Sequence, residues 1–278
     1  MKLQTIVDIA PSKWKIGYED KILMLGSCFS DEIGEQMQQR YLNVTCNPFG
    51  TLYNPLSIAQ AMQMTDMPQL VEHEGLWHSM AHHGSFSRAN QHEAEQAIRA
   101  SIETMQQALK EATVVIVTFG TAWVYEKDGE IVGNCHKLPE SCFTRRRLSV
   151  EEIVAAWRPI LDCYPDKHWL FTVSPIRHIK DGLHENQLSK ATLLQAVEQI
   201  VLHSYPSPAT RRYFPSYEIL LDELRDYRFY ADDLVHPSSL AVNYIWERFV
   251  DTFCTPQTKN ELVLQLKRWK HEHHLPLH

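Results

Sequence analysis

The sequence predicts an α/β protein built around a mostly parallel β-sheet. Three short apolar runs, rich in β-branched and aromatic residues and without polar alternation, lie at Ile22–Leu25, Val114–Phe119 and Trp169–Val173. Such runs are typical of strands that are covered on both faces. Longer segments with apolar residues at helical spacing follow them along the chain. Strands that alternate with helices favour right-handed β-α-β units, and therefore parallel neighbouring strands.

The remaining elements follow from the same patterns. Two further strands are predicted at Val44–Cys46 and around Tyr217–Leu221, and Lys127–Glu130 has the composition of a tight hairpin turn between Trp123–Glu126 and Ile131–Gly133. This hairpin is expected as an insertion after the third strand. Helical spacing predicts helices over Asp31–Tyr41, Pro55–Met64, Gln91–Lys110, Val150–Leu161, Ser189–His203, Ser239–Phe253 and Asn260–His271.

Bulk properties limit the domain organisation and the partners. The 278 residues contain no linker-like stretch and no internal repeat, so we expect one domain over residues 1–278 with a helical extension near 256–278. A formal net charge of −7 makes nucleic acid an unsuitable main partner. The basic runs Arg145–Arg147 and Arg211–Arg212 are expected to be solvated surface. No apolar stretch approaches the length that spans a bilayer, so no membrane partner is expected.

Cysteine usage and the N-terminal residues bear on the compartment. Six cysteines are scattered along the chain without a CxxC pair, so neither a zinc knuckle nor a redox motif is indicated, and no metal or other cofactor is expected. The N-terminal residues carry an early acid at Asp8 and lack the apolar core of a signal peptide. We therefore expect a cytoplasmic protein with free thiols.

Polar residues gather where the predicted strands end. Ser27 ends the first strand, Thr121 follows the third, Ser174–His178 follows the fourth, and Asp233–His236 lies in a loop after the last strand. In an open parallel sheet, ligands bind at the carboxyl ends of the strands. One edge of the sheet therefore collects a hydroxyl, an imidazole and several hydrogen-bond donors, and this convergence indicates an enzyme.

The residue types at this edge are those of hydroxyl activation, which requires a base and an anion that orients the base. Ser27, at the start of the helix predicted over Asp31–Tyr41, would be the nucleophile, His236 the base and Asp233 the orienting acid. Two plainer readings stay open. Ser27 could simply cap the helix, although Ser30 could serve instead. Asp233 and His236 could form no more than an ion pair within their loop.

Cys28 is a rival nucleophile, because a thiol near a helix N-terminus can have a lowered pKa. Adjacent side chains at the end of a strand point in opposite directions, so only one of Ser27 and Cys28 is expected to face the cleft. Small buried cysteines are common, and we expect Cys28 to be buried and Ser27 to face the cleft.

Five short motifs resemble the GSCFA family, which belongs to the SGNH (GDSL-like) hydrolase superfamily. The resemblance runs from about Leu23 to about Phe249, and the chain has Ser30 where the family usually has alanine. It implies a three-layer α/β/α sandwich of flavodoxin-like topology and an esterase-type serine hydrolase. The motifs are Gly26–Ser30, Asn47–Thr51, Gly120–Trp123, Asn134–Lys137 and Ser174–His178.

The resemblance also implies roles for individual residues. It assigns the nucleophile to Ser27, the other triad members to Asp233 and His236, and one oxyanion-hole N–H group to Gly50. The superfamily normally adds an asparagine amide in its third block, and this chain has Gly120-Thr121 there. Because one oxyanion donor contributes about 100- to 1000-fold in rate, a substitute is expected.

Several residues qualify as the substitute donor or as substrate ligands. Asn134 is the first choice as donor, with Thr121 and His136 as alternatives. Arg177 or His178 could bind a carboxylate or phosphate of the substrate, and an Arg177 salt bridge at the strand end is an equal alternative. The expected substrate is a small-molecule or carbohydrate ester. Hydrolysis and acyl transfer are not distinguished by the sequence, and the oligomeric state is open.

Two other function classes compete with the esterase. A metal-dependent hydrolase would use the histidines of the segment from His78 to His83, including His82, although no ligand spacing such as H-E-x-x-H is present. A non-catalytic carbohydrate- or nucleotide-binding module could retain a hydrolase fold without its activity. Four C-terminal histidines are expected at a solvated helix end, namely His271, His273, His274 and His278.

Overall fold

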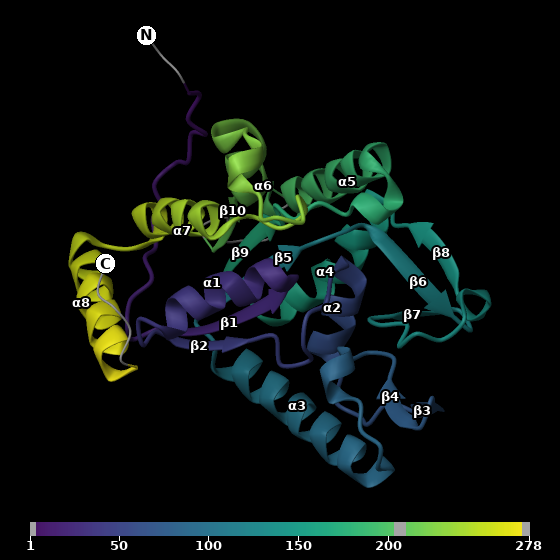
Figure 1. The fold of residues 1–278 in the computed structure, drawn as a ribbon. Coiled ribbons are helices and arrows are strands. Elements are labelled where there is room, and N and C mark those ends of the chain that lie inside the picture. Colours follow the sequence, from purple (N-terminus) through teal and green to yellow (C-terminus); the bar gives the residue numbers. More distant parts are fainter. Residues whose placement is uncertain (1–3, 203–209, 274–278) are drawn as a thin grey trace.

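The computed structural model describes residues 4–202 and 210–273. Its central sheet has five parallel strands in the order β10-β9-β5-β1-β2 (Figure 1). Numbered along the chain, this is the order 2-1-3-4-5 of one class of doubly wound folds. The predicted α/β fold with a parallel central sheet is confirmed. The strands span β1 Lys21–Gly26, β2 Asn43–Cys46, β5 Val114–Phe119, β9 His168–Val173 and β10 Arg211–Phe214.

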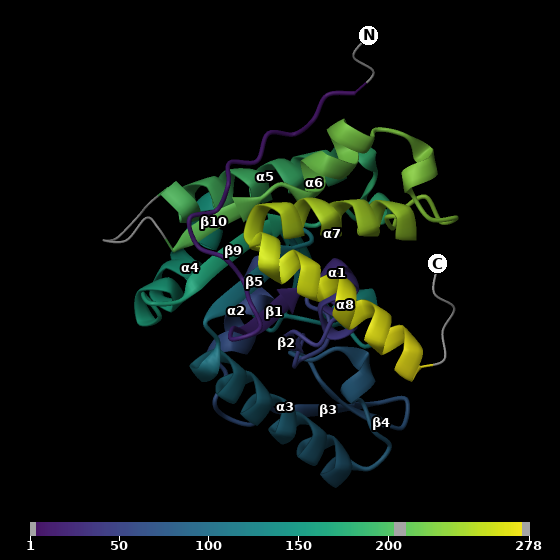
Figure 2. The ribbon, with the colours of Figure 1, turned by 90° about the vertical axis from the view of Figure 1, so that its left-hand side faces the viewer.

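Helices cover both faces of this sheet (Figures 1 and 2). One face packs against α1 and α7, whereas α2, α3, α4 and α5 pack on the other. The C-terminal helix α8 adds Leu262 to the core on the α1–α7 side. The helices span α1 Cys28–Gln38, α2 Pro55–Gln63, α3 Gln91–Glu111, α4 Val150–Cys163, α5 Leu183–Leu202, α7 Ser239–Phe253 and α8 Pro256–Glu272.

Strand β1 illustrates why the apolar runs lack polar alternation. Ile22 and Met24 belong to the core with α1 and α7, and Leu23 and Leu25 belong to the core with α2 to α5. Successive side chains of a strand point to opposite faces, so a strand between two helical layers needs apolar residues at every position. This double coverage confirms the reading of the continuous runs as central strands.

The predicted strand around Tyr217–Leu221 is wrong. These residues form α6 (Ser216–Glu218) and the π-helical turn η4 (Ile219–Leu224). The fifth strand is the preceding segment β10, which pairs with β9. A short buried apolar run does not reveal its own period, so strand and helix look alike in such a segment.

Two antiparallel insertions decorate the sheet. The predicted hairpin is confirmed as β6 (Trp123–Lys127) and β7 (Glu130–Val132), and β8 (Thr144–Arg147) joins β6 as a third strand that the sequence analysis did not predict. The second insertion is a hairpin of β3 (Leu70–His73) and β4 (Leu76–Ser79). Short 3₁₀ turns are η1 Gly84–Phe86, η2 Glu140–Cys142, η3 Ile179–Asp181 and η5 Tyr227–Phe229.

The start of the last helix differs from the expected one. Helix α8 starts at Pro256, earlier than predicted, because the Thr255 hydroxyl caps it by accepting from the Thr258 N–H group. His203, the predicted end of the helix that starts at Ser189, lies outside the described residues, as do His274 and His278. Within the described ranges, every helix is too short or too polar to cross a membrane.

Candidate active site

A cavity of about 510 Å³ lies at the carboxyl ends of β1, β5 and β9. β1 and β5 are neighbours in the sheet, and the order in which the chain adds strands reverses between them. Doubly wound folds bind ligands at the carboxyl ends of the strands at such a switch point. Five residues that the sequence analysis selected line the cavity, namely Thr121, Asn134, Arg177, His178 and His236. The predicted convergence at one edge is therefore present for these side chains.

Asp233 and His236 form a hydrogen-bonded pair beside this cavity. The His236 Nδ1 atom lies 2.6 Å from Asp233 Oδ2, while Asp233 Oδ1 accepts the backbone N–H groups of Val235 at 2.8 Å and His236 at 3.0 Å. These hydrogen bonds lower the pKa of Asp233 to about 2, and the largest effect comes from the backbone N–H of His236, followed by the His236 imidazole and the Val235 N–H. A carboxylate held in this way fixes the imidazole ring and leaves its Nε2 free.

The loop that carries this pair is fastened at several points. Leu234 has φ of 57°, and its N–H donates to the Ala231 carbonyl at 2.9 Å. The N–H of Ala231 donates to the carbonyl of His236 at 2.8 Å. Arg177 ties the loop to the end of β9, because its backbone N–H donates to Val235 and its guanidinium donates to Leu234, each at 3.1 Å.

The turn after β1 places Ser27 and Cys28 in the reverse of the expected orientation. Gly26 has φ of 134°, and a Cβ there would lie 2.1 Å from the Thr118 carbonyl, so the turn requires glycine. Ser27 is 1% exposed, and its Oγ is enclosed without a hydrogen-bond partner in the described structure. Cys28 is half-buried and lines the cavity. Ser27 occupies the N-cap position of α1 without a side-chain cap bond.

The predicted oxyanion donor Gly50 does not border the cavity in the described structure. Its N–H donates to the Asn47 carbonyl at 2.7 Å within a turn, and its φ is 74°. Asn47, which the sequence analysis named only as the first residue of a motif, has a structural role that was not predicted. Its Oδ1 accepts from the Gly26 N–H at 2.8 Å and its Nδ2 donates to Asp31 at 2.7 Å. Asn47 therefore connects this turn to the end of β1 and to α1.

The three candidates for the substitute oxyanion donor differ in position. Asn134 lines the cavity, and its Oδ1 accepts from the His136 N–H at 2.8 Å, so its amide Nδ2 is left to donate. Thr121 also lines the cavity, but its hydroxyl shares a 3.1 Å hydrogen bond with Ser189. His136 lies outside the lining, with Nε2 2.8 Å from the Ser79 carbonyl.

His178 is enclosed at the base of the site. Its ring packs edge-on against Tyr53, and its Nε2 is buried without a hydrogen-bond partner among the described residues. Burial, helped by the nearby positive charges of Lys190 and His236, lowers the pKa of His178 to about 3. His178 is therefore neutral at physiological pH and can exchange a hydrogen bond but offers no charge to an anion.

Lys190 is the principal feature that the sequence analysis missed. It is 1% exposed, and its Nζ donates to the carbonyls of Gly120 and Ser174, each at 2.7 Å. These carbonyls follow β5 and β9, so Lys190 ties together the two strand ends under the site. The sequence carried one signal of this burial: Lys190 precedes the apolar Leu193 by three residues and therefore lies on the same, buried face of α5.

The cavity wall carries more positive than negative charge. Its charged residues in the described structure, apart from histidine, are Arg145, Arg177 and Lys180 against the single carboxylate of Asp181. Arg145 pairs with Asp181 and packs over the Trp123 ring at 4.6 Å. The Arg145–Arg147 run, expected to be plain surface, is thus engaged in ion pairs, and Arg145 borders the site.

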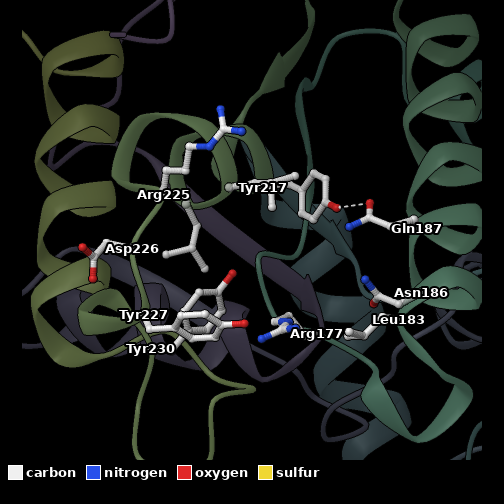
Figure 3. Close-up of a pocket in the computed structure, with 11 residues that line it drawn as sticks. Arg177, Leu183, Asn186, Gln187, Tyr217, Arg225, Asp226, Tyr227 and Tyr230 are labelled. Atoms are coloured by element: carbon white, nitrogen blue, oxygen red, sulfur yellow. Dashed lines mark hydrogen bonds between the residues drawn. The ribbon is translucent and has the colours of Figure 1, made fainter. Parts of the chain in front are cut away.

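Arg177 also borders a smaller pocket of about 270 Å³ beside the main cavity (Figure 3). Its guanidinium lies 5.3 Å from the centre of the Tyr230 ring and 5.9 Å from that of Tyr227. On the far side of this pocket, Tyr217 donates to Gln187 at 2.8 Å. Arg177 is therefore a shared wall between the cavity that contains His236 and an aromatic pocket.

The histidines of the segment from His78 to His83 serve the packing beneath the Gly50 turn. His82 is fully buried, stacks on Phe49 with ring centres 4.0 Å apart, and contacts the Ser79 and Ser101 hydroxyls at 2.7 and 2.9 Å. His78 contacts the Ser87 hydroxyl at 2.7 Å. Over residues 4–202 and 210–273, no group of three or more His, Cys, Asp or Glu side chains is arranged to hold a metal ion.

The comparisons with known proteins give a family. No curated protein matches the chain. The model of the GSCFA family matches residues 21–249, which include β1, the Asp233–His236 loop and every strand of the central sheet. Because this match spans most of the sequence, the protein belongs to the GSCFA family.

Proposed function

We propose that this protein hydrolyses acyl esters in the cavity at the ends of β1, β5 and β9. The observation that carries the proposal is the 2.6 Å hydrogen bond between Asp233 Oδ2 and His236 Nδ1, with His236 on the wall of that cavity. A carboxylate-oriented imidazole beside a nucleophile-bearing turn is the arrangement used for acyl transfer. The resemblance of the motifs to SGNH hydrolases supports the same reaction class.

In this mechanism Asp233 holds the imidazole, and His236 Nε2 takes a proton from a side chain of the β1–α1 turn. Ser27 is the nucleophile that the sequence predicts, and Cys28 is its neighbour in the same turn. The attacked carbonyl oxygen becomes negative and is stabilised by the free N–H groups at the start of α1. The Asn134 amide is the side-chain donor that replaces the missing asparagine. His236 then protonates the leaving alcohol, and water releases the acid.

The charges around the cavity favour an ester that carries an anionic group. Arg145, Arg177 and Lys180 outweigh Asp181 on its wall. Arg177 is the strongest candidate for contact with a carboxylate or phosphate, because its planar guanidinium matches those groups and reaches both the cavity and the adjoining aromatic pocket. His178 is neutral and is assigned a hydrogen-bonding role only.

Hydrolysis of p-nitrophenyl acetate tests the proposal. We expect the kcat/KM of His236→Gln to fall about 1000-fold and that of Asp233→Asn to fall about 100-fold or more, because the base is lost or loses its orientation. His184→Gln, an exposed substitution on α5, is the matched control and should keep wild-type turnover. Thermal unfolding of each variant verifies that the fold is intact.

The outcomes also separate the competing functions. Equal turnover by the wild type, His236→Gln and Asp233→Asn would remove the pair from the mechanism. Turnover abolished by a chelator would favour a metal-dependent hydrolase. Complete inactivity of the folded wild type on acetyl esters, both neutral and anionic, would favour a binding module.

A further inference from the structure

We propose that the nucleophile of this site is the thiol of Cys28 and that the reaction passes through a thioester on that residue. This inference rests on the proposed acyl-ester hydrolysis and specifies the atom that attacks. It is carried by the positions of two adjacent side chains. Cys28 borders the cavity that contains His236, whereas the Ser27 hydroxyl is enclosed by protein and is not part of the cavity lining.

The Ser27 hydroxyl is badly placed to attack a substrate. Its Oγ has no contact with solvent and no hydrogen-bond partner in the described structure. The side chain lies against the chain after β5, where a Cβ added to Gly120 would sit 3.4 Å from the Ser27 Cβ. An imidazole in the cavity can take a proton only from a group that it can reach, and Ser27 is outside the cavity lining.

Cys28 has the surroundings that a nucleophile needs. It is the first residue of α1, so free N–H groups of the helix start, those of Cys28 and Phe29, lie near its thiol. Burial raises the pKa of the Cys28 thiol, and the backbone N–H groups of Cys28 and Phe29 offset only part of this rise. The thiol is therefore neutral at physiological pH and requires a base.

His236 is placed to assist that deprotonation. His236 borders the same cavity, and its side chain is 47% exposed, so its Nε2 is open to a group in the cavity while Nδ1 is held by Asp233.

The chemical step balances with water as the only co-reactant. His236 Nε2 removes the thiol proton as Cys28 Sγ bonds to the acyl carbon. The carbon–oxygen bond to the alcohol breaks, and the alcohol leaves with the proton from His236. A water molecule then attacks the thioester, again giving up a proton to His236. The carbon–sulfur bond breaks, the carboxylic acid leaves, and the thiol takes back its proton.

Alkylation by iodoacetamide tests the nucleophile without any substrate. Cys135 is the matched internal control, because it is also half-buried and lines the same cavity. Mass spectrometry of digested protein is expected to show Cys28 alkylated at least about 10-fold faster than Cys135 in the wild type. His236→Gln should remove this advantage. Equal rates at the two cysteines, or a Cys28 rate independent of His236, would overturn the inference.

Turnover of p-nitrophenyl acetate provides the second test. Cys28→Ala should lower kcat/KM about 1000-fold. Cys28→Ser should fold normally and show a large loss of kcat/KM. The kcat/KM of Ser27→Ala should stay within about 10-fold of the wild-type value. Cys163→Ala, on an exposed part of α4, is the control for loss of a thiol. Acid-quenched wild type should carry an acetyl group on Cys28 that neutral hydroxylamine removes.

The variants distinguish failure of this inference from failure of the proposed function. Loss of turnover in Ser27→Ala and His236→Gln, with retention in Cys28→Ala, would overturn the thiol nucleophile and leave an ester hydrolase with a serine. Full turnover in all three variants would overturn both proposals.

Discussion

Substitution of Gly50 by alanine measures how tightly the turn after β2 is built. Gly50 has φ of 74°, and a Cβ at this position would lie 2.3 Å from the Cβ of His83. Gly75 has the same φ of 74° but nothing within 4 Å of an added Cβ. Gly75→Ala therefore reports the cost of the left-handed backbone alone, and Gly50→Ala adds the steric contact to the same backbone cost.

The two contributions have separate magnitudes. An alanine in the left-handed region costs about 1 kcal/mol, which is the full expected loss for Gly75→Ala. Relieving a contact of 2.3 Å between two Cβ atoms requires the backbone of one segment to move, and overpacking of this kind costs about 1–3 kcal/mol more. Gly50→Ala should therefore lower the free energy of unfolding by about 2–4 kcal/mol.

Urea unfolding followed by circular dichroism measures both values from the transition midpoints. The movement that relieves the clash also shifts the turn joined by Asn47 to β1 and α1, so Gly50→Ala should lower ester turnover while Gly75→Ala leaves it unchanged. Equal losses of stability in the two variants would refute the packing of His83 against Gly50.

Three further predictions concern other buried or charged groups. Lys190→Met leaves the carbonyls of Gly120 and Ser174 without their donor, so the free energy of unfolding should fall by about 2 kcal/mol or more in urea titrations; an unchanged midpoint would contradict these bonds. Burial, with a smaller effect of His136, lowers the pKa of His82 from 6.5 to about 4, so the unfolded chain binds the proton first as the pH falls. The contribution of His82 to the free energy of unfolding should therefore fall by about 2 kcal/mol between pH 7 and pH 5. His82→Gln should lack this contribution, so urea unfolding of both proteins at each pH should show a smaller loss of stability in the variant. Arg177→Gln should raise KM about 10-fold for acetyl esters that carry a carboxylate and leave KM for p-nitrophenyl acetate nearly unchanged; equal effects on both substrates would exclude an anion-binding role.

Much of the fold was predictable because it depends on burial patterns that are local in the sequence. The doubly covered strands show as continuous apolar runs, and α7 was predicted with its observed ends, Ser239 and Phe253. Its N-cap, Ser238, accepts from the Ala241 N–H group. The strand predicted around Tyr217–Leu221 failed because a short buried run has no readable period. Strand β8 was missed because its charged residues form ion pairs that are visible only in three dimensions.

The location of the candidate site could be predicted from the sequence, but the directions in which its side chains point could not. Parallel strands bring Thr121, Arg177 and His178 to one edge whatever the side-chain details. Which of Ser27 and Cys28 faces the cavity depends on the backbone conformation of the glycine turn. Alternation predicted only that one of them faces it, and the expectation that Cys28 is a small buried cysteine selected the wrong one. The burial of Lys190 beneath the strand ends likewise depends on tertiary packing.

The central claim is that His236 drives formation of a covalent acyl-enzyme in the described cavity. Rapid mixing of excess p-nitrophenyl acetate with the protein measures this directly, because the first turnover releases p-nitrophenol before the acyl group is hydrolysed. We predict a burst equal to the concentration of active sites in the wild type and no burst in His236→Gln. A linear time course with the same rate in both proteins would contradict the account.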